Sequence, residues 1–214
     1  MFEYVQERES TSPLTTRTMV YVIIIGESDK DDPEKLSERG ENQVTEIAMS
    51  RVVAGVRRIY SATSKLALST SKILAEEFTA KIQKRKCLDD VNIGKKSDTH
   101  QALLEMWKNE EYEPNDGESF VLARERFGEC MNEIASKHSG DVFAVVTHPL
   151  IGVLFHSLVT AAPLDIDNWL SSGYASCASY EFSRKGWSEV MPTDNSYLSD
   201  PTSVADGYPE GHFD

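Results

Sequence analysis

Continuous apolar runs and amphipathic stretches alternate along this chain. Two of the runs, residues 19–25 and 142–146, are rich in β-branched side chains and contain no charge. Such runs are typical of strands that are buried on both faces of a parallel sheet. Helical periodicity, with Ser37 as an N-cap and Pro149 in a first turn, predicts helices between the runs. The expected elements are strands at 19–25, 56–61, 81–88 and 141–147, helices at 37–53, 64–78, 101–111, 118–137 and 149–159, and a final strand pair at 175–182 and 187–191.

This alternation predicts an α/β fold, a three-layer α/β/α sandwich around a doubly wound, mostly parallel central sheet. Sites in such sheets lie at the carboxyl ends of strands. Ile25 and His148 each follow a buried run, so we expect them to lie near each other at one edge of the sheet. We expect residues 1–18 to form a flexible N-terminal arm, 19–198 the domain, and 199–214 a mobile acidic tail rich in Asp, Gly, Pro and Ser.

Composition narrows the classes of partner. The 214 residues carry a formal charge of -13, which disfavours nucleic acid and anionic membrane surfaces. The apolar runs are too short to span a bilayer, and residues 1–18 lack the apolar core of a signal peptide. Cys87, Cys130 and Cys177 have no metal-ligand spacing, so we expect reduced, buried thiols in a cytoplasmic protein without metal or cofactor.

A series of short segments resembles the histidine phosphatases and phosphoglycerate mutases over about residues 19–198. Gly26-Glu27-Ser28 stands where that family has Arg-His-Gly-Glu-Ser. Further segments follow in the family's order: 36–40 resembles Leu-Thr-x-x-Gly, 59–71 resembles Val-Tyr-Ser-Ser-Pro-Leu-x-Arg-Ala-x-Gln-Thr-Ala, 88–94 resembles Leu-x-Glu-x-x-x-Gly, 117–126 resembles Gly-Glu-Ser…Arg, 145–148 resembles the start of Val-Val-Ser-His-Gly, and 193–198 resembles Asn-Asp-x-x-His-Leu. The resemblance implies a phosphoglycerate mutase-like fold.

The resemblance also implies a site, which this chain lacks in large part. In the family, two arginines and two histidines clamp a phosphoryl group, one histidine attacks it, and a carboxylic acid protonates the leaving oxygen. By motif position, Ile24 and Leu66 replace the arginines and Ile25 replaces the nucleophile, while His148 remains and Asp90 stands at the acid position. An isoleucine side chain has no lone pair and cannot accept a phosphoryl group. We therefore expect the phosphate pocket to have become part of the core, without tightly bound phosphate or sulfate.

Two functions are compatible with this pattern. The first is a pseudoenzyme that keeps the fold as a binding, regulatory or assembly module, with an unknown protein partner or a second copy of itself in a homodimer. The second is a phosphatase or mutase with a recast site that uses His148 and nearby lysines, namely Lys65, Lys95 and Lys96. The substitution of the nucleophile favours the first.

Several of these residues also have purely structural interpretations. His148 can be a satisfied histidine behind a strand, and Asp90 a solvated loop carboxylate. Glu118 and Arg126 are expected to form or cap a helix, although the resemblance places such a Glu-Ser loop at the rim of the substrate pocket.

Overall fold

The computed structural model describes residues 17–94 and 99–209. Its centre is a six-stranded sheet in the order β3-β2-β4-β1-β5-β6. The strands are β1 (Thr18–Ile24), β2 (Arg58–Ser61), β3 (Lys81–Lys84), β4 (Val142–Thr147), β5 (Cys177–Ser183) and β6 (Gly186–Asp194). The pairs from β3 to β1 are parallel, whereas β5 and β6 add an antiparallel ribbon.

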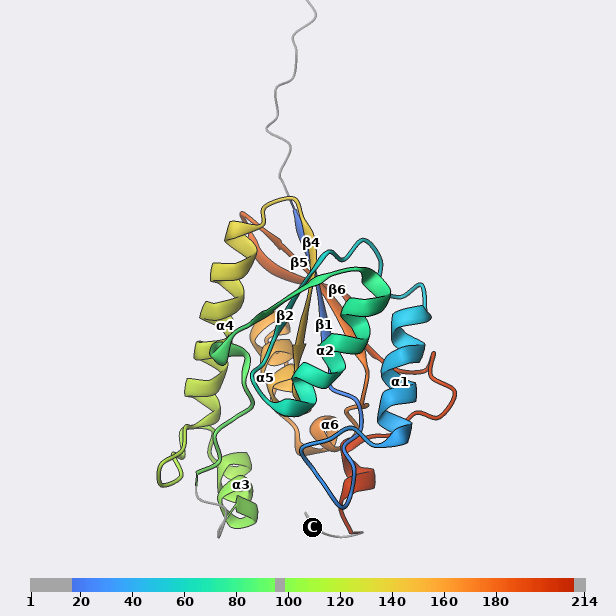
Figure 1. Cartoon of the computed structure of the whole chain (residues 1–214). Coiled ribbons are helices and arrows are strands. Elements are labelled where there is room, and N and C mark those ends of the chain that lie inside the picture. The colour runs from blue at the N-terminus through green and yellow to red at the C-terminus, as the bar shows by residue number, and fades with distance from the viewer. Residues whose placement is uncertain (1–16, 95–98, 210–214) are drawn as a thin grey trace, which may run out of the picture.

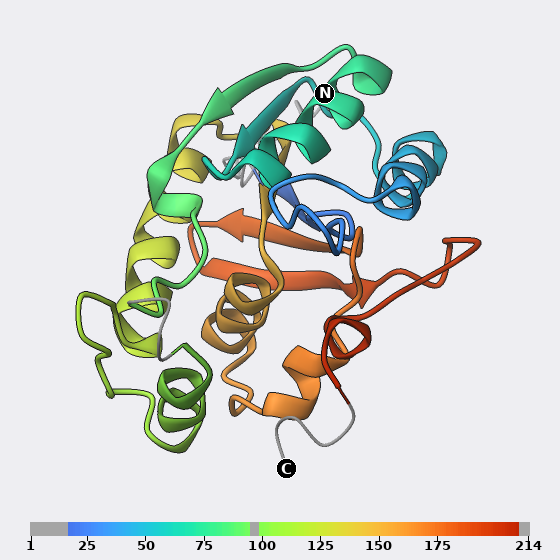
Figure 2. The same ribbon diagram turned by 60° about the horizontal axis from the view of Figure 1, so that its bottom comes forward.

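Helices cover both faces of this sheet (Figures 1 and 2). α1 (Glu38–Met49) and α2 (Lys65–Phe78) lie on one face, and α4 (Phe120–Lys137) and α5 (Pro149–Thr160) lie on the other. The shorter elements are η1 (Lys86–Leu88), α3 (Thr99–Lys108), α6 (Ile166–Leu170) and η3 (Val204–Gly207). The predicted three-layer α/β/α class and its mostly parallel sheet are confirmed.

The two charge-free runs form the adjacent central strands β1 and β4. In β1, Val20 and Ile23 are fully buried, and in β4 the whole segment from Phe143 to Val146 is fully buried. Because helices cover both faces, neither strand needs a polar side, which explains the continuous apolar sequence. The outer strand β3 differs, since all four of its residues are exposed.

Hydroxyl side chains begin three of the helices. Ser37 accepts from the amide of Gly40, Ser64 from Ala67, and Ser119 from Leu122, so each satisfies an otherwise unpaired first-turn N–H. The Ser37 cap and the first-turn position of Pro149 agree with the sequence. The helix expected to reach residue 53 ends at Met49, where Ser50 leaves the helical conformation.

The run expected to be one strand at 81–88 divides. β3 ends at Lys84, and η1 then turns Leu88 into the core, where it is fully buried and its carbonyl accepts from the Thr147 hydroxyl at 2.8 Å. The short helix α6 was not predicted from the sequence, since its five residues are too few to show a period.

Two of the three cysteines are not reduced thiols. Cys87 in η1 and Cys130 in α4 form a disulfide, with Cα atoms 5.9 Å apart. The expectation of three reduced thiols is therefore wrong for this pair, because spacing along the chain does not reveal that η1 packs against α4. Cys177 is free and buried, as expected, and burial raises the pKa of its thiol to about 12.

Packed structure continues beyond the expected domain boundary at residue 198. The amide of Ser199 donates to Glu46 at 2.7 Å, and the Gln43 amide donates to the Thr202 hydroxyl at 2.8 Å. Val204, in η3, is 3% exposed. The boundary at 198 was thus placed too early, because side chains of α1 and the core anchor this polar segment. The arm expected at residues 1–18 falls mainly outside the described residues, although Thr18 belongs to β1.

None of the helices within 17–94 and 99–209 has the length and apolar character needed to cross a bilayer.

Candidate functional site

Ile25 and His148 lie side by side, as the sequence predicted. β1 and β4 are parallel neighbours, with Ile24 opposite Thr147 in the register. The amide of Ile25 donates to the Thr147 carbonyl at 3.0 Å, immediately before His148. The two positions that the resemblance assigns to nucleophile and stabilising histidine thus meet at the carboxyl edge of the sheet.

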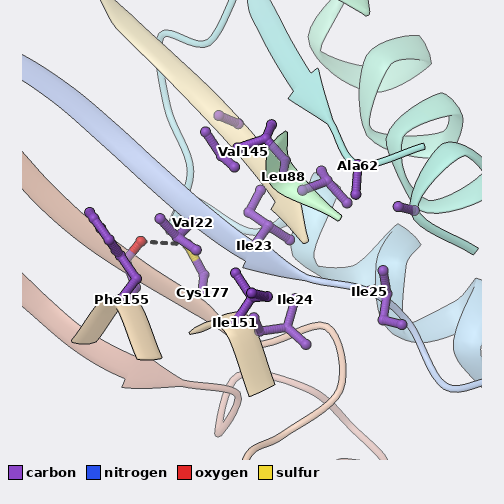
Figure 3. Close-up of a cluster of buried hydrophobic side chains, with 14 of the residues drawn as sticks. Val22, Ile23, Ile24, Ile25, Ala62, Leu88, Val145, Ile151, Phe155 and Cys177 are labelled. Carbon is purple, nitrogen blue, oxygen red and sulfur yellow. Dashed lines mark hydrogen bonds between the residues drawn. The ribbon is translucent and has the colours of Figure 1, made fainter. Parts of the chain in front are cut away.

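Aliphatic side chains occupy the positions of the attacking and clamping groups. Ile24 and Ile25 are each only 4% exposed and belong to the main hydrophobic core. In Figure 3, Ile24 lies beside Ile151 of α5, while Ile25 lies apart from both. Leu66, in the first turn of α2, is half-buried and packs against the same core. None of these three side chains can hydrogen-bond to an anion.

His148 has a partner within the protein. It is 8% exposed, and its Nε2 lies 2.9 Å from the Ser64 hydroxyl. Ser64 also accepts from the Ala67 amide, so its single hydrogen is available for Nε2 when the ring proton is on Nδ1. The Nδ1 atom is buried and has no hydrogen-bond partner. The sequence did not indicate Ser64, which stands at the position of an apolar leucine in the resembling motif.

Asp90, at the acid position, is engaged in its own turn. Its carboxylate accepts from the adjacent amide of Val91 at 2.9 Å. The neighbouring Asp89 is the carboxylate that faces the start of α2, since it accepts from the Thr63 amide at 2.5 Å and from the Thr63 hydroxyl at 2.7 Å. Sequence reasoning did not identify Asp89, because its role depends on a contact across 26 residues of chain.

Arg126 is fully used in holding this loop. Its guanidinium forms a two-point ion pair with Glu118, with N···O distances of 3.0 and 2.7 Å. The same group donates to the carbonyls of Cys87, Asp89 and Asp90 at 2.8, 3.0 and 3.2 Å. Its donors bind protein oxygens, so Arg126 has a structural role, but the pair braces the loop and does not cap the helix, because Ser119 is the cap of α4 and Glu118 precedes it.

Of the three lysines considered as substitutes, Lys65 lies within the described residues, and it is paired with a carboxylate. The ammonium of Lys65 lies 2.5 Å from the carboxylate of Glu34, which raises the pKa of that exposed lysine. Lys95 and Lys96 lie outside the described residues.

A cavity opens on the other side of Ile24. It has a volume of about 330 Å³ and lies between α5, α6 and the end of β6, with Gly152, Asn168, Ser176 and Asn195 among its lining. A Cβ at Gly152 would lie only 2.8 Å from Ile24 Cδ1, so helix and strand are in tight contact where the cavity begins. His148 and Leu66 do not line it.

Across residues 17–94 and 99–209, no three His, Cys, Asp or Glu side chains are grouped so that they could hold a metal ion.

Comparisons with known proteins agree with this architecture. A family model described as the histidine phosphatase superfamily (branch 1) matches residues 25–195. No curated protein sequence matches the chain.

Solved structures with the same fold include YhfR from Bacillus stearothermophilus, with a TM-score of 0.71 and 20% identity over 85% of this chain and 100% of that one. A phosphoglycerate mutase from Bacillus anthracis gives a TM-score of 0.66 and 17% identity over 90% of this chain and 97% of that one. A phosphoserine phosphatase mutant from Entamoeba histolytica, in complex with phosphoserine, gives a TM-score of 0.70 and 13% identity over 85% of this chain and 99% of that one. At these identities the likeness concerns the fold alone.

Proposed function

Because this chain belongs to the histidine phosphatase superfamily, we propose that it is a pseudoenzyme, in which the fold has kept a binding, regulatory or assembly role and has lost phosphoryl transfer. The observation that carries this proposal is the pair of aliphatic side chains at Ile24 and Ile25, each 4% exposed. Such burial leaves neither a nucleophile nor a guanidinium where phosphoryl chemistry requires them.

Energetics support the proposal. Each hydrogen bond to a charged group contributes roughly 1.5–3 kcal/mol, and a phosphate removed from water without such bonds is strongly destabilised. The position of His148 alone cannot compensate, because its Nε2 already faces Ser64. Loss of the attacking group removes the covalent pathway as a whole rather than a fraction of its rate.

The charge of the chain limits the class of partner that the module can bind. The net charge of -13 argues against nucleic acid and anionic lipid, and among macromolecules it favours a protein partner or a second copy of this chain. We place the protein in the cytoplasm, which requires that the Cys87–Cys130 pair be reduced there for part of the time.

The test is an activity assay on the purified chain with aryl phosphate and phosphoglycerates. We expect no turnover above background and no acid-labile phosphohistidine. The variant His148→Ala serves as the control for contaminating enzyme. Activity that copurifies with the chain and disappears in His148→Ala would overturn the proposal.

A second candidate is an enzyme with a recast site around His148, favoured by one contact. Ser64 lies 2.9 Å from His148 Nε2, which is a nucleophile-to-base distance. In that case Ser64→Asn, which retains the helix cap, would abolish activity. His148→Ala would abolish it as well. Lys65→Met would leave it unchanged, since Lys65 pairs with Glu34.

A further inference from the structure

Strand β3 and the residues that follow it concentrate positive charge on an acidic chain. Residues 81–86 read Lys-Ile-Gln-Lys-Arg-Lys, with four cations and no carboxylate, whereas the whole chain has a formal charge of -13. All four residues of β3 are exposed, and Lys86 is exposed as well. Charge concentrated in this way attracts groups of the opposite sign over a Debye length, roughly 8–10 Å. A negatively charged partner would therefore meet this segment on favourable terms.

The lysines of this segment are available to such a partner. Lys81, Lys84 and Lys86 form no ion pair within the part of the chain that the structure describes. Arg58 of the neighbouring strand differs, because it pairs with Asp141 at 2.8 Å. The positive charge of β3 is thus not neutralised by the protein itself.

The backbone of β3 is open on its outer side. The amides of Lys81 and Arg85 donate to carbonyls at β2, at 3.1 and 2.8 Å. Because a strand directs the backbone groups of alternate residues to opposite sides, the N–H and C=O groups of Ile82 and Lys84 point away from β2. β3 is the last strand in the sheet order, and Figure 2 shows it at the rim with no described strand outside it. These groups can hydrogen-bond to an added strand.

The two faces of this edge differ in character. Alternation places Lys81 and Arg85 on one face and Ile82 and Lys84 on the other. Arg85 keeps an extended backbone, and its guanidinium lies 5.8 Å from the centre of the Tyr60 ring, which fixes that charge beside β2. Ile82 is 37% exposed and offers apolar contact on the second face. A strand that alternates acidic with apolar side chains matches both faces.

We propose that β3 is a docking edge for an extended acidic segment of a partner protein, which joins the sheet as a further strand with alternating carboxylate and apolar side chains. This proposal rests on the binding role proposed above, to which it gives a surface and a class of partner. It does not rest on the absence of turnover, since it uses none of the residues at the vestigial phosphate site.

The test is a titration of the full chain with a capped, fluorescently labelled octapeptide of alternating Glu and Val, in about 20 mM salt. We expect a Kd below about 1 mM, and binding at least about fivefold weaker in 0.5 M salt. The same peptide with Gln in place of Glu should also bind at least about fivefold more weakly. No binding of the acidic peptide, or equal binding of the Gln peptide, would overturn the proposal.

N-methylated peptides test whether the backbone pairs. A strand presents its N–H groups alternately to its two edges, so methylation of all Glu amides in one version and all Val amides in another blocks one edge at a time. At least one version should lose measurable binding, because its blocked edge is the one that faces β3. Binding of both versions as tight as that of the parent peptide would overturn strand addition. Equally tight binding of a single-stranded oligonucleotide of the same net charge would do so as well, since it would show attraction to any polyanion.

Two double variants locate the site. Lys81→Gln with Lys84→Gln removes two charges from β3 and should weaken peptide binding by at least about threefold. Arg184→Gln with Lys185→Gln is the matched control, because it removes two exposed charges from the turn between β5 and β6, at the other end of the strand order. Equal effects of the two double variants would contradict docking at β3.

The phosphatase assay on the same preparations keeps the two proposals apart. Turnover would contradict the loss of phosphoryl transfer alone, whereas a lack of peptide binding would contradict the docking edge alone.

Discussion

The two regions beside the carboxyl end of β1 differ in how tightly they are packed. On the side of Ile25 and His148, buried aliphatic side chains and the Ser64 hydroxyl surround the positions that the resemblance assigns to the nucleophile and the stabilising histidine. On the side of Ile24, a cavity of about 330 Å³ with hydroxyl and amide groups remains between α5, α6 and β6. The His148 side is closed, although its buried Nδ1 has no hydrogen-bond partner, whereas the Ile24 side is open. One strand end can thus border a tightly packed region on one side and a cavity on the other.

The largest effect is expected when the phosphate-binding residues of the family motif are introduced at their three positions in this chain. Ile24→Arg, Ile25→His and Leu66→Arg together put charged or polar groups where apolar packing now exists. We expect at most weak phosphatase activity, and a loss of roughly 3–5 kcal/mol for each buried, uncompensated charge. Urea denaturation and aryl phosphate hydrolysis measure the two effects.

Leu66→Arg alone is the matched control, because Leu66 is only half-buried and its change should cost far less. Robust activity of the triple variant with unchanged stability would show that the closed side is still an open, polar pocket.

The disulfide has the next largest expected effect. Cys87 and Cys130 are 43 residues apart, and a loop of that length corresponds to about 4 kcal/mol in the chain-entropy model. Cys130→Ala, or reduction, should therefore lower the free energy of unfolding by up to that amount, measured by urea denaturation with and without reductant.

Cys177→Ala provides the control, since it keeps the disulfide and its stability should respond to reductant as that of the parent chain does. The Cys177 thiol, whose pKa burial raises to about 12, should resist alkylation at neutral pH in the folded chain. Rapid alkylation of all three cysteines without reductant would contradict the disulfide.

The contact between the two sides can be tested at Gly152. Gly152→Ala would place a methyl group 2.8 Å from Ile24 Cδ1, and overpacking of this kind costs about 1–3 kcal/mol before the helix-propensity gain of roughly 1 kcal/mol. We expect a net loss of about 1 kcal/mol, recovered when Ile24→Val is added.

Gly128→Ala, in α4, is the comparison. There the new methyl group would meet Leu158 Cδ2, the end of a flexible side chain that is 45% exposed. We expect this substitution to be neutral or stabilising. Equal destabilisation by both would mean that Ile24 does not press on α5 as described.

The smallest effect concerns Ser64. Ser64→Ala removes the cap of α2 and the partner of His148, and should lower stability by about 1 kcal/mol. Ser64→Asn should recover most of the loss by restoring the cap. Thermal unfolding of the two variants side by side separates the cap from the contact with His148.

The fold was predictable because its signals are local or follow from parallel pairing. Continuous apolar runs identified β1 and β4, and parallel neighbours place their carboxyl ends together, which brings Ile25 beside His148. The contacts that complete the site are different in kind. Ser64 reaches His148 across 84 residues, and Cys87 reaches Cys130 through the packing of η1 on α4. Neither depends on a pattern that a sequence displays.

The cavity was not predictable at all, because a cavity is defined by the atoms that surround it and not by any single residue. Ser176 has no local feature that separates it from a solvent-exposed serine. The segment after residue 198 was misjudged for a related reason. Its polar composition is typical of a mobile tail, but Gln43 and Glu46 of α1 provide specific partners for it.

Strand β3 limits how copies of this chain can associate. As an outer strand of the sheet it has one row of backbone groups without a strand neighbour, and such an edge can extend into a second molecule. In a two-fold pairing of this edge, the exposed Lys81 and Lys84 would lie opposite the same lysines of the second copy. Repulsion between four ammonium groups opposes that pairing and protects the chain from edge-to-edge aggregation. A homodimer would therefore have to form through another surface, and a sheet that continues from one subunit to the other would have to pair through the opposite outer strand, β6.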